Sequence, residues 1–247
     1  MTMKTATSHT KTKRTGLFTI GLMVAGLSLA AVPASAFQAR PASLVHSGPL
    51  SPSFVVVVES SAPAKDSQKM GQGAQDFVDN MAQKALDFLS DEDLDHDAKK
   101  KQFRRLLQTS FDMDTIGRFS LGRYWRTATK EQRTEYLSLF KNLIVEIYAA
   151  RFSDYKGERF ETRSFRTDGE KDTIVTSFIV PNDGTPDVQV DWRVWYKNGS
   201  YKIIDVLVEG VSMSVTQRSD FAAVIQRGGG EVQVLLDHLK SQKQAAL

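Results

Sequence analysis

The spacing of apolar residues changes near residue 157, and this change constrains the fold more than any other feature of the sequence. Before it, apolar residues recur every three to four positions, which is typical of one face of a helix. After it, they alternate with polar residues in four runs between residues 157 and 210, which is typical of half-buried strands. The runs are separated by Asp168-Gly169, Pro181-Asn182-Asp183-Gly184 and Asn198-Gly199, and an Asn-Gly pair in this setting strongly favours a hairpin. The sequence therefore predicts a four-stranded antiparallel meander.

Helices are expected on both sides of this meander. Residues 68–109 have helical spacing, interrupted at 90–101, and residues 129–153 form the clearest helix because Thr129 and Gln132 make a capping box. Two further helices, at about 212–226 and 231–246, are separated by three glycines. Helices, then strands, then helices again indicate an α+β domain over residues 68–247. We expect the helix at 129–153 to cover the apolar face of the sheet.

The acidic run at 91–97 does not match a calcium-binding loop. Counting from Asp91, His96 stands where such a loop needs glycine and Gln102 where it needs glutamate. The run is interpreted as a solvated connection between two helices, with Asp97 as the N-cap of the second helix.

The first 36 residues have the layout of a secretory signal peptide, with a basic start, an apolar core at 17–31 and an Ala34-Ser35-Ala36 cleavage site. The segment holds four of the 32 Lys+Arg and none of the 29 Asp+Glu, so the mature chain has 28 cations, 29 acids and a net charge of −1. That balance gives no argument for nucleic-acid binding. Residues 37–67 are rich in proline and serine and are expected to be a disordered linker. Within it, Phe54–Val58 could be an edge strand or an adhesive patch.

Residues for catalysis are scarce. The chain has no cysteine, and the mature part has three histidines in unrelated segments, so no zinc site of ordinary spacing or cysteine-protease site can be assembled. Asp112 and Asp114 could be an acid/base pair, although an N-cap role for Asp112 is favoured. Asp205 could be a hydrogen-bonded structural carboxylate or a functional group with a raised pKa. The remaining candidates are Arg118, Arg123 and Arg126. They could surround a phosphate-binding opening or simply face solvent.

Two stretches of the sequence resemble a known family. Residues 111–140 resemble the first signature of the MlaC-type "toluene tolerance" auxiliary family of ABC lipid-transport systems, and residues 203–221 resemble the second. The first match consists of Phe111, Asp112, Leu121, Gly122, Tyr124, Trp125, Ala128, Thr129, Gln132, Arg133 and Phe140. The second consists of Asp205, Glu209, Gly210, Val211, Ser212, Arg218 and Phe221. A hopanoid-associated branch, HpnM, is similar as well.

The resemblance implies a monomeric, soluble periplasmic carrier without metal or cofactor. Such a carrier binds a phospholipid between helices and a curved four-stranded meander that enclose an apolar pocket. It would exchange the lipid with an inner-membrane MCE-domain/ABC transporter complex and an outer-membrane lipoprotein complex. On the helix, the lipid-binding candidates are Phe140, Ile144, Ile147 and Tyr148. On the sheet, they are Ile174, Phe178, Val190, Trp192, Val194, Ile204, Val206 and Val208.

Three alternatives remain open from the residues alone. The apolar helix and sheet could close into a dry core, which is the ordinary outcome and would indicate a ligand-free interaction module. The lipid could be a hopanoid. An enzyme acting on lipids would require Asp205 or Ser212 to be catalytic.

Overall fold

The structure is a computed structural model that describes residues 65–169 and 171–245. The expected signal peptide, the Phe54–Val58 run and the linker as far as residue 64 lie outside the described residues. The last three residues of the expected linker, 65–67, belong to the first helix.

Seven α-helices and one short 3-10 helix are present among the described residues, and four of the α-helices start at a side-chain N-cap. Asp112 accepts a hydrogen bond from the Thr115 backbone N–H over 2.9 Å, and the capping box of Thr129 and Gln132 is formed, so both predictions are confirmed. The N-cap of the second helix is Asp95 instead of Asp97, because the Asp95 carboxylate accepts from the Ala98 N–H over 2.7 Å. The helices are α1 (Lys65–Ser90), α2 (His96–Ser110), α3 (Met113–Leu121), α4 (Tyr124–Thr127), α5 (Lys130–Ala149), η1 (Phe152–Asp154), α6 (Met213–Arg227) and α7 (Val232–Ala245).

The strands form one antiparallel sheet in chain order. They are β1 (Arg159–Asp168), β2 (Asp172–Val180), β3 (Val188–Lys197), β4 (Ser200–Val208) and β5 (Val211–Ser212). The predicted α+β class and the four-stranded meander are confirmed, and the fifth strand is a two-residue addition that pairs with the end of β4. Register shifts between Thr162 and Ser164 in β1, and opposite Arg193 and Val194 in β4, bend the sheet locally.

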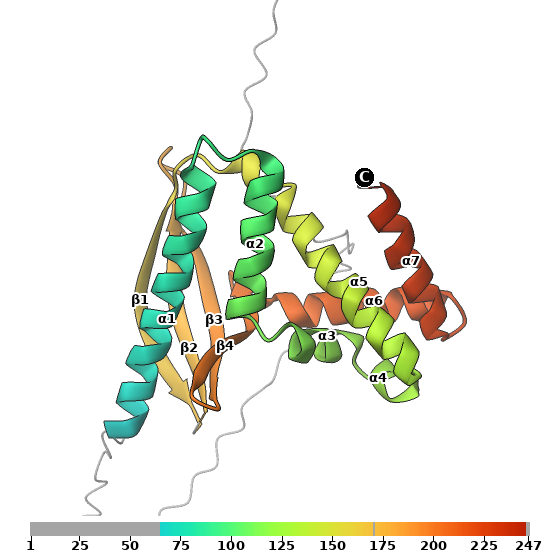
Figure 1. Cartoon of the computed structure of the whole chain (residues 1–247). Coiled ribbons are helices and arrows are strands. Elements are labelled where there is room, and N and C mark those ends of the chain that lie inside the picture. Colours follow the sequence, from blue (N-terminus) through green and yellow to red (C-terminus); the bar gives the residue numbers. More distant parts are fainter. Residues whose placement is uncertain (1–64, 170, 246–247) are drawn as a thin grey trace, which may run out of the picture. The chain divides into compact units, whose positions relative to one another are not determined.

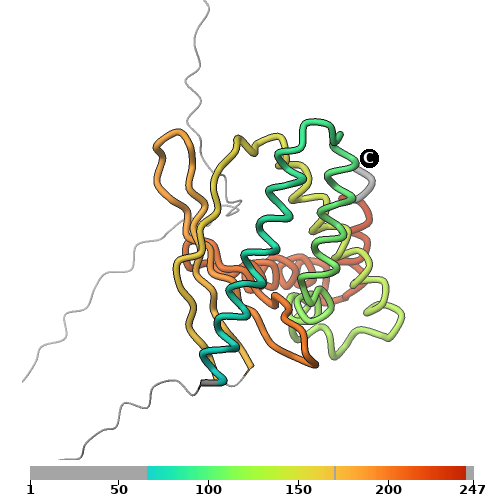
Figure 2. The backbone as a smooth tube through the Cα atoms, turned by 60° about the vertical axis from the view of Figure 1, so that its left-hand side comes forward, coloured from blue at the N-terminus to red at the C-terminus, as the bar shows by residue number. Residues whose placement is uncertain are grey.

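The helix that covers the sheet is α1 and not α5, so the expectation for residues 129–153 is wrong. Helix α1 contacts β1, β2 and β3, whereas α5 packs mainly against α2, α3 and α7. Figures 1 and 2 both show α1 lying against the strands, and Figure 1 shows α5 running away from the sheet toward α7. The close approach of α1 depends on Gly71 and Gly73, where an added Cβ would lie 2.1 Å from Phe165 and 2.2 Å from Tyr201.

The apolar side chains form two cores. The helical core is formed by α2 to α7 and includes Leu121, Tyr136, Phe140, Phe221, Ile225, Leu235 and Leu236. The sheet core lies between α1, α2 and the strands and includes Ala74, Val78, Met81, Leu106, Val175, Val194 and Ile203. Phe103 and Phe111 pack against both cores and connect them.

Candidate functional site

The apolar stripe of α5 extends beyond the helical core. Phe140 is 1% exposed and stacks on Tyr136, and Ile144 is half-buried at the edge of the core. Four positions on, Tyr148 is 42% exposed, and the neighbouring Ile147 is 43% exposed. Residues 140, 144, 147 and 148 share one helix face. We call Ile144, Ile147 and Tyr148 the helix surface; it is the end of the stripe at which exposure to solvent rises.

Aromatic contacts link the helix surface to the sheet core. The ring of Tyr148 lies 6.2 Å from Phe103, and Phe103 lies 5.5 Å from Phe152 between ring centroids. Phe152 packs in the sheet core, where its ring lies 6.1 Å from Phe88. Loss of hydration raises the pKa of the Tyr148 phenol although its side chain is reached by solvent. The Tyr148 side chain is thus packed against protein on one side and reached by solvent on another.

The sheet presents a second partly open apolar surface on its helix-facing side. Val190 pairs with Val208, and Trp192 pairs with Val206, so these four residues share a face. Val190 is buried, whereas the other three are half-buried. The Trp192 ring lies 6.1 Å from Phe160, which packs in the sheet core. We call Trp192, Val206 and Val208 the sheet surface.

The structure does not bring all the predicted residues together. Ser177 pairs with Val190, and Val175 pairs with Trp192, so Ile174 and Phe178 alternate onto the opposite face of the sheet. There the Arg163 guanidinium lies 3.8 Å from the centre of the Phe178 ring. Ile204 is the extra residue at the register shift of β4. Phe140 and Val194 lie in the helical and sheet cores respectively.

Three aromatic residues beside these surfaces were absent from the sequence-based candidates: Phe103, Phe152 and Phe160. Phe152 follows Tyr148 by four residues, and this helical spacing could have identified it. Phe103 and Phe160 come from α2 and β1, and no local pattern places them near α5 or β3.

Asp205 acts as a structural carboxylate that joins β4 to α6. It accepts hydrogen bonds from the Ser212 hydroxyl over 2.6 Å and from the Val206 N–H over 2.9 Å. The Ser214 hydroxyl and N–H also donate to it. Ser212 is in turn the N-cap of α6. Both oxygens of Asp205 are therefore occupied by the turn that starts the helix.

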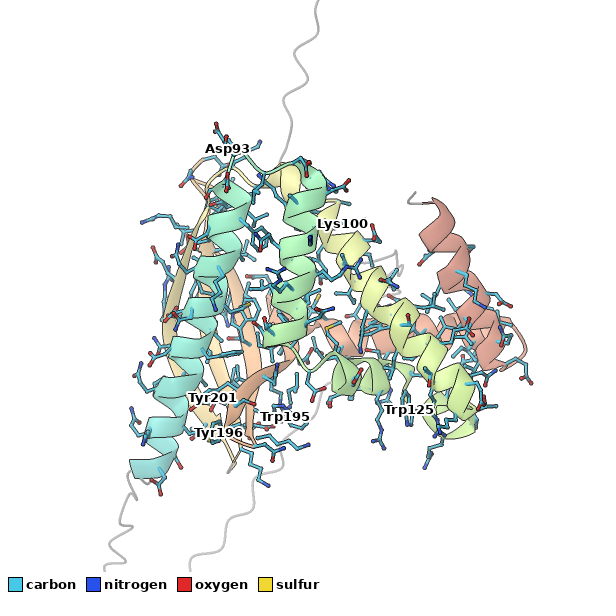
Figure 3. All side chains as sticks on the ribbon, in the orientation of Figure 1. Asp93, Lys100, Trp125, Trp195, Tyr196 and Tyr201 are labelled. Carbon is cyan, nitrogen blue, oxygen red and sulfur yellow. The ribbon has the colours of Figure 1, made fainter. Side chains whose placement is uncertain are left out.

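Asp114 of α3 and Lys100 of α2 each form an ion pair with α5. Asp114 forms an ion pair with Lys141 over 2.7 Å, whereas Asp112 caps α3. The two carboxylates therefore have separate partners. Lys100 of α2, which is labelled in Figure 3, forms an ion pair with Glu146 of α5. Within residues 65–169 and 171–245, no cluster of three or more His, Asp or Glu side chains could hold a metal ion. In the same residues, no helix has the length and apolar character needed to cross a bilayer.

The architecture defines an α+β class in which an open antiparallel sheet is joined to a helical core. A phospholipid-binding protein from Ralstonia solanacearum, solved in complex with a phospholipid, has this fold. It aligns with a TM-score of 0.61 and 25% identity over 70% of this chain and 98% of its own.

The chain belongs to the MlaC family, since the family model described as MlaC protein matches residues 79–241. It is 24% identical over 160 residues to the intermembrane phospholipid transport system binding protein MlaC of Haemophilus influenzae, covering 60% of this chain and 75% of that protein. It is 25% identical over 147 residues to the toluene tolerance protein ttg2D of Pseudomonas putida, covering 58% and 68%. The resemblance of residues 111–140 and 203–221 is thereby confirmed.

Proposed function

We propose that this protein is a phospholipid carrier, and that the acyl chains of its ligand bind along the helix surface of α5 and the sheet surface of β3 and β4. Membership of the MlaC family supports the ligand class, as does the phospholipid bound to the relative from Ralstonia solanacearum. The observation that carries the proposal is the exposed end of the α5 stripe, where Ile147 and Tyr148 extend from a completed core.

The energetics of lipid transfer require such surfaces. A two-chain phospholipid hides about 30 methylenes at ~0.8 kcal/mol each, so exposing it to water costs roughly 20–25 kcal/mol. A protein moves the lipid through water only if apolar side chains replace most of its contacts with the bilayer. Half-buried Trp192, Val206 and Val208 together with Ile147 provide side chains of this kind.

In this proposal, the carrier passes phospholipid between the outer and inner membranes of the periplasm as the auxiliary component of an ABC transport system. Its partners are an inner-membrane MCE-domain/ABC transporter complex and an outer-membrane lipoprotein complex. The signal-peptide pattern of residues 1–36 supports export. Carriage makes and breaks no covalent bond, so the function requires no reactive group, and direction comes from ATP hydrolysis in the transporter.

The test is to purify the exported protein, extract it with chloroform and methanol, and identify the extract by mass spectrometry. We expect a phospholipid in stoichiometric amount. An extract without lipid would instead indicate a ligand-free interaction module. An extract that contains a pentacyclic hopanoid would show that the ligand is a hopanoid and not a phospholipid. Turnover of a labelled phospholipid by the purified protein would contradict carriage and favour an enzyme.

A further inference from the structure

The corner formed by α3, α4, the start of α5 and α6 carries five arginines that form no ion pair with any carboxylate in the described part of the chain. By contrast, Arg163 and Arg193 on the sheet bond to Asp187 and Asp172 over 2.7 and 2.9 Å. We call the unpaired set the arginine surface; it consists of Arg118, Arg123, Arg126, Arg133 and Arg218.

Two of these arginines lie against the Trp125 ring, and a third, Arg126, accepts a hydrogen bond from one of them through its backbone carbonyl. The guanidinium of Arg118 lies 5.8 Å and that of Arg133 lies 5.4 Å from the centre of the indole ring. Arg133 also donates to the Trp125 carbonyl over 2.8 Å and to the Arg126 carbonyl over 3.3 Å. Trp125 lies at the α4 end of the helical part (Figure 3). These contacts hold Arg118 and Arg133 in place before any partner arrives.

The other two arginines lie on the same corner. Arg218 of α6 stacks over Phe119 of α3 at 5.3 Å, and Phe119 is 43% exposed. Gly122, with φ of 59°, leaves room for this arginine, because a Cβ there would lie 2.7 Å from the Arg218 Nε. Arg123 donates to the Tyr124 hydroxyl over 2.9 Å. Phe119 is thus exposed and Trp125 half-buried beneath these guanidinium groups, and Trp and Arg are enriched among the residues that dominate binding energy in protein interfaces.

The positive charge of this corner is balanced neither within residues 115–133 nor by residues 37–64. Residues 115–133 contain five Lys+Arg and one acid, Glu131. Residues 37–64 contain one acid, Glu59, and one base, Arg40, so they cannot neutralise it. Burying several unpaired guanidinium groups is costly unless carboxylates or phosphates meet them. Whatever covers the corner must therefore be anionic.

We propose that the arginine surface, with Phe119 and Trp125, is a docking site for an acidic face of a partner protein. Ordered planar guanidinium groups suit bidentate pairing with fixed carboxylates, where rigid geometry adds specificity. A bilayer is less suitable, because membrane-surface binding uses aromatic side chains that enter the acyl region. Here guanidinium groups stack on the rings of Trp125 and Phe119, so inserting the rings would carry charges into the lipid. The inference rests on the proposed function only for the choice of binding partners in its test.

The test compares Arg118→Glu/Arg126→Glu with the charge-matched control Lys84→Glu/Lys101→Glu, whose lysines are exposed on α1 and α2. Each protein is titrated against the purified MCE-domain complex and the purified outer-membrane lipoprotein complex at low and high salt. We expect wild-type affinity for at least one complex to fall with salt, and the arginine variant to bind it about tenfold or more weakly than the control variant. Replacing an acidic residue of that partner's docking face by a basic one should restore binding of the arginine variant.

Bound lipid is measured on the same samples, so a failure of lipid carriage and a failure of docking are distinguished. Equal affinities of the arginine and lysine variants for both complexes would overturn the proposal. The proposal would also be overturned if the wild type bound phosphatidylglycerol vesicles and the arginine variant lost this binding while keeping its affinity for both complexes. Self-association of the wild type through the acidic run at 91–97, abolished by the arginine variant, would also overturn it.

Discussion

The Trp192 indole Nε1 donates a hydrogen bond to the Ser177 hydroxyl on the neighbouring strand over 2.8 Å. Ser177 is fully buried, and its hydroxyl donates onward to the Val190 carbonyl over 3.0 Å. The polar edge of the indole is thus satisfied inside the sheet. The half-buried ring is left as apolar surface, which suits the proposed contact with acyl chains.

Replacing either partner of this hydrogen bond should have unequal effects. Ser177→Ala leaves the indole N–H without an acceptor, so we expect a loss of about 1–3 kcal/mol in the free energy of unfolding. Trp192→Phe removes the donor and keeps an aromatic ring, so the loss should be smaller and lipid occupancy should persist. Urea unfolding and lipid extraction measure the two quantities. A greater loss of stability in Trp192→Phe would contradict this account.

Ile147→Asp should remove bound lipid and keep the fold. The side chain is 43% exposed, so the carboxylate remains hydrated in the empty protein and meets acyl chains only when lipid is bound. The matched control is Val234→Asp on α7, which is 36% exposed and outside the proposed surfaces. Mass spectrometry of extracts should show lipid in the control and little in Ile147→Asp. Equal lipid in both would exclude Ile147 from the site.

Asp205→Ala should destabilise the junction of β4 and α6. It removes the acceptor of hydrogen bonds from Ser212 and Ser214, and hydrogen bonds to charged groups are strong. We expect a loss of about 2–4 kcal/mol in the free energy of unfolding. Asp220→Ala, at an exposed site, should change it by about 0.5 kcal/mol or less. If thermal melting shows equal effects, Asp205 has no special structural role.

Tyr136 should make stability fall at alkaline pH. Its hydroxyl donates to the Gly117 carbonyl over 2.9 Å, and burial raises its pKa well above the ordinary value of 10.0. Above pH 10 the unfolded chain loses this proton and the folded chain retains it, so the free energy of unfolding falls with rising pH. The slope from this group approaches about 1.4 kcal/mol per pH unit. Tyr136→Phe should show a shallower decline in urea unfolding between pH 9 and 11. If the stabilities of the wild type and of Tyr136→Phe fall in parallel with pH, Tyr136 is not the source of the decline.

Gly71→Ala should destabilise, although alanine is the better helix former. The added Cβ would lie 2.1 Å from the Phe165 ring, so α1 or the ring must move. Overpacking of this kind costs about 1–3 kcal/mol, which exceeds the roughly 1 kcal/mol gained in helix propensity. The control is Gln72→Ala, at the exposed neighbouring position. A Gly71→Ala variant as stable as wild type in urea would show that the sheet tolerates a wider separation from α1.

Local signals in the sequence predicted local structure well. Thr129 and Gln132 cap α5 as expected, and Asp112 caps α3. Asn198-Gly199 forms the turn between β3 and β4. The one capping error assigned the start of α2 to Asp97, although Asp95 in the same acidic run is the N-cap. Such features depend on a few neighbouring residues, so the sequence contains nearly all the information they need.

Assignments that depend on distant residues were less successful. Alternation in β2 predicts two faces but not which one meets the helices, so Ile174 and Phe178 were grouped with Val190 although they lie on the other side. The amphipathic stripe of α5 predicts that the helix packs, and it packs on α7 and α3 instead of the sheet. The glycines that let α1 approach the strands gave no signal of that role.

The sequence by itself determined the order of the long helices and of the four long strands, most of the caps and turns that bound them, and family membership through residues 111–140 and 203–221. These follow from hydrophobic period, backbone preference and residue identity, all of which are local. Only the tertiary structure decided that α1 covers the sheet, that two cores form, and that Ile147 and Tyr148 remain exposed. The physical reason is that burial is a property of pairs of surfaces, and a stripe on one element does not specify its partner.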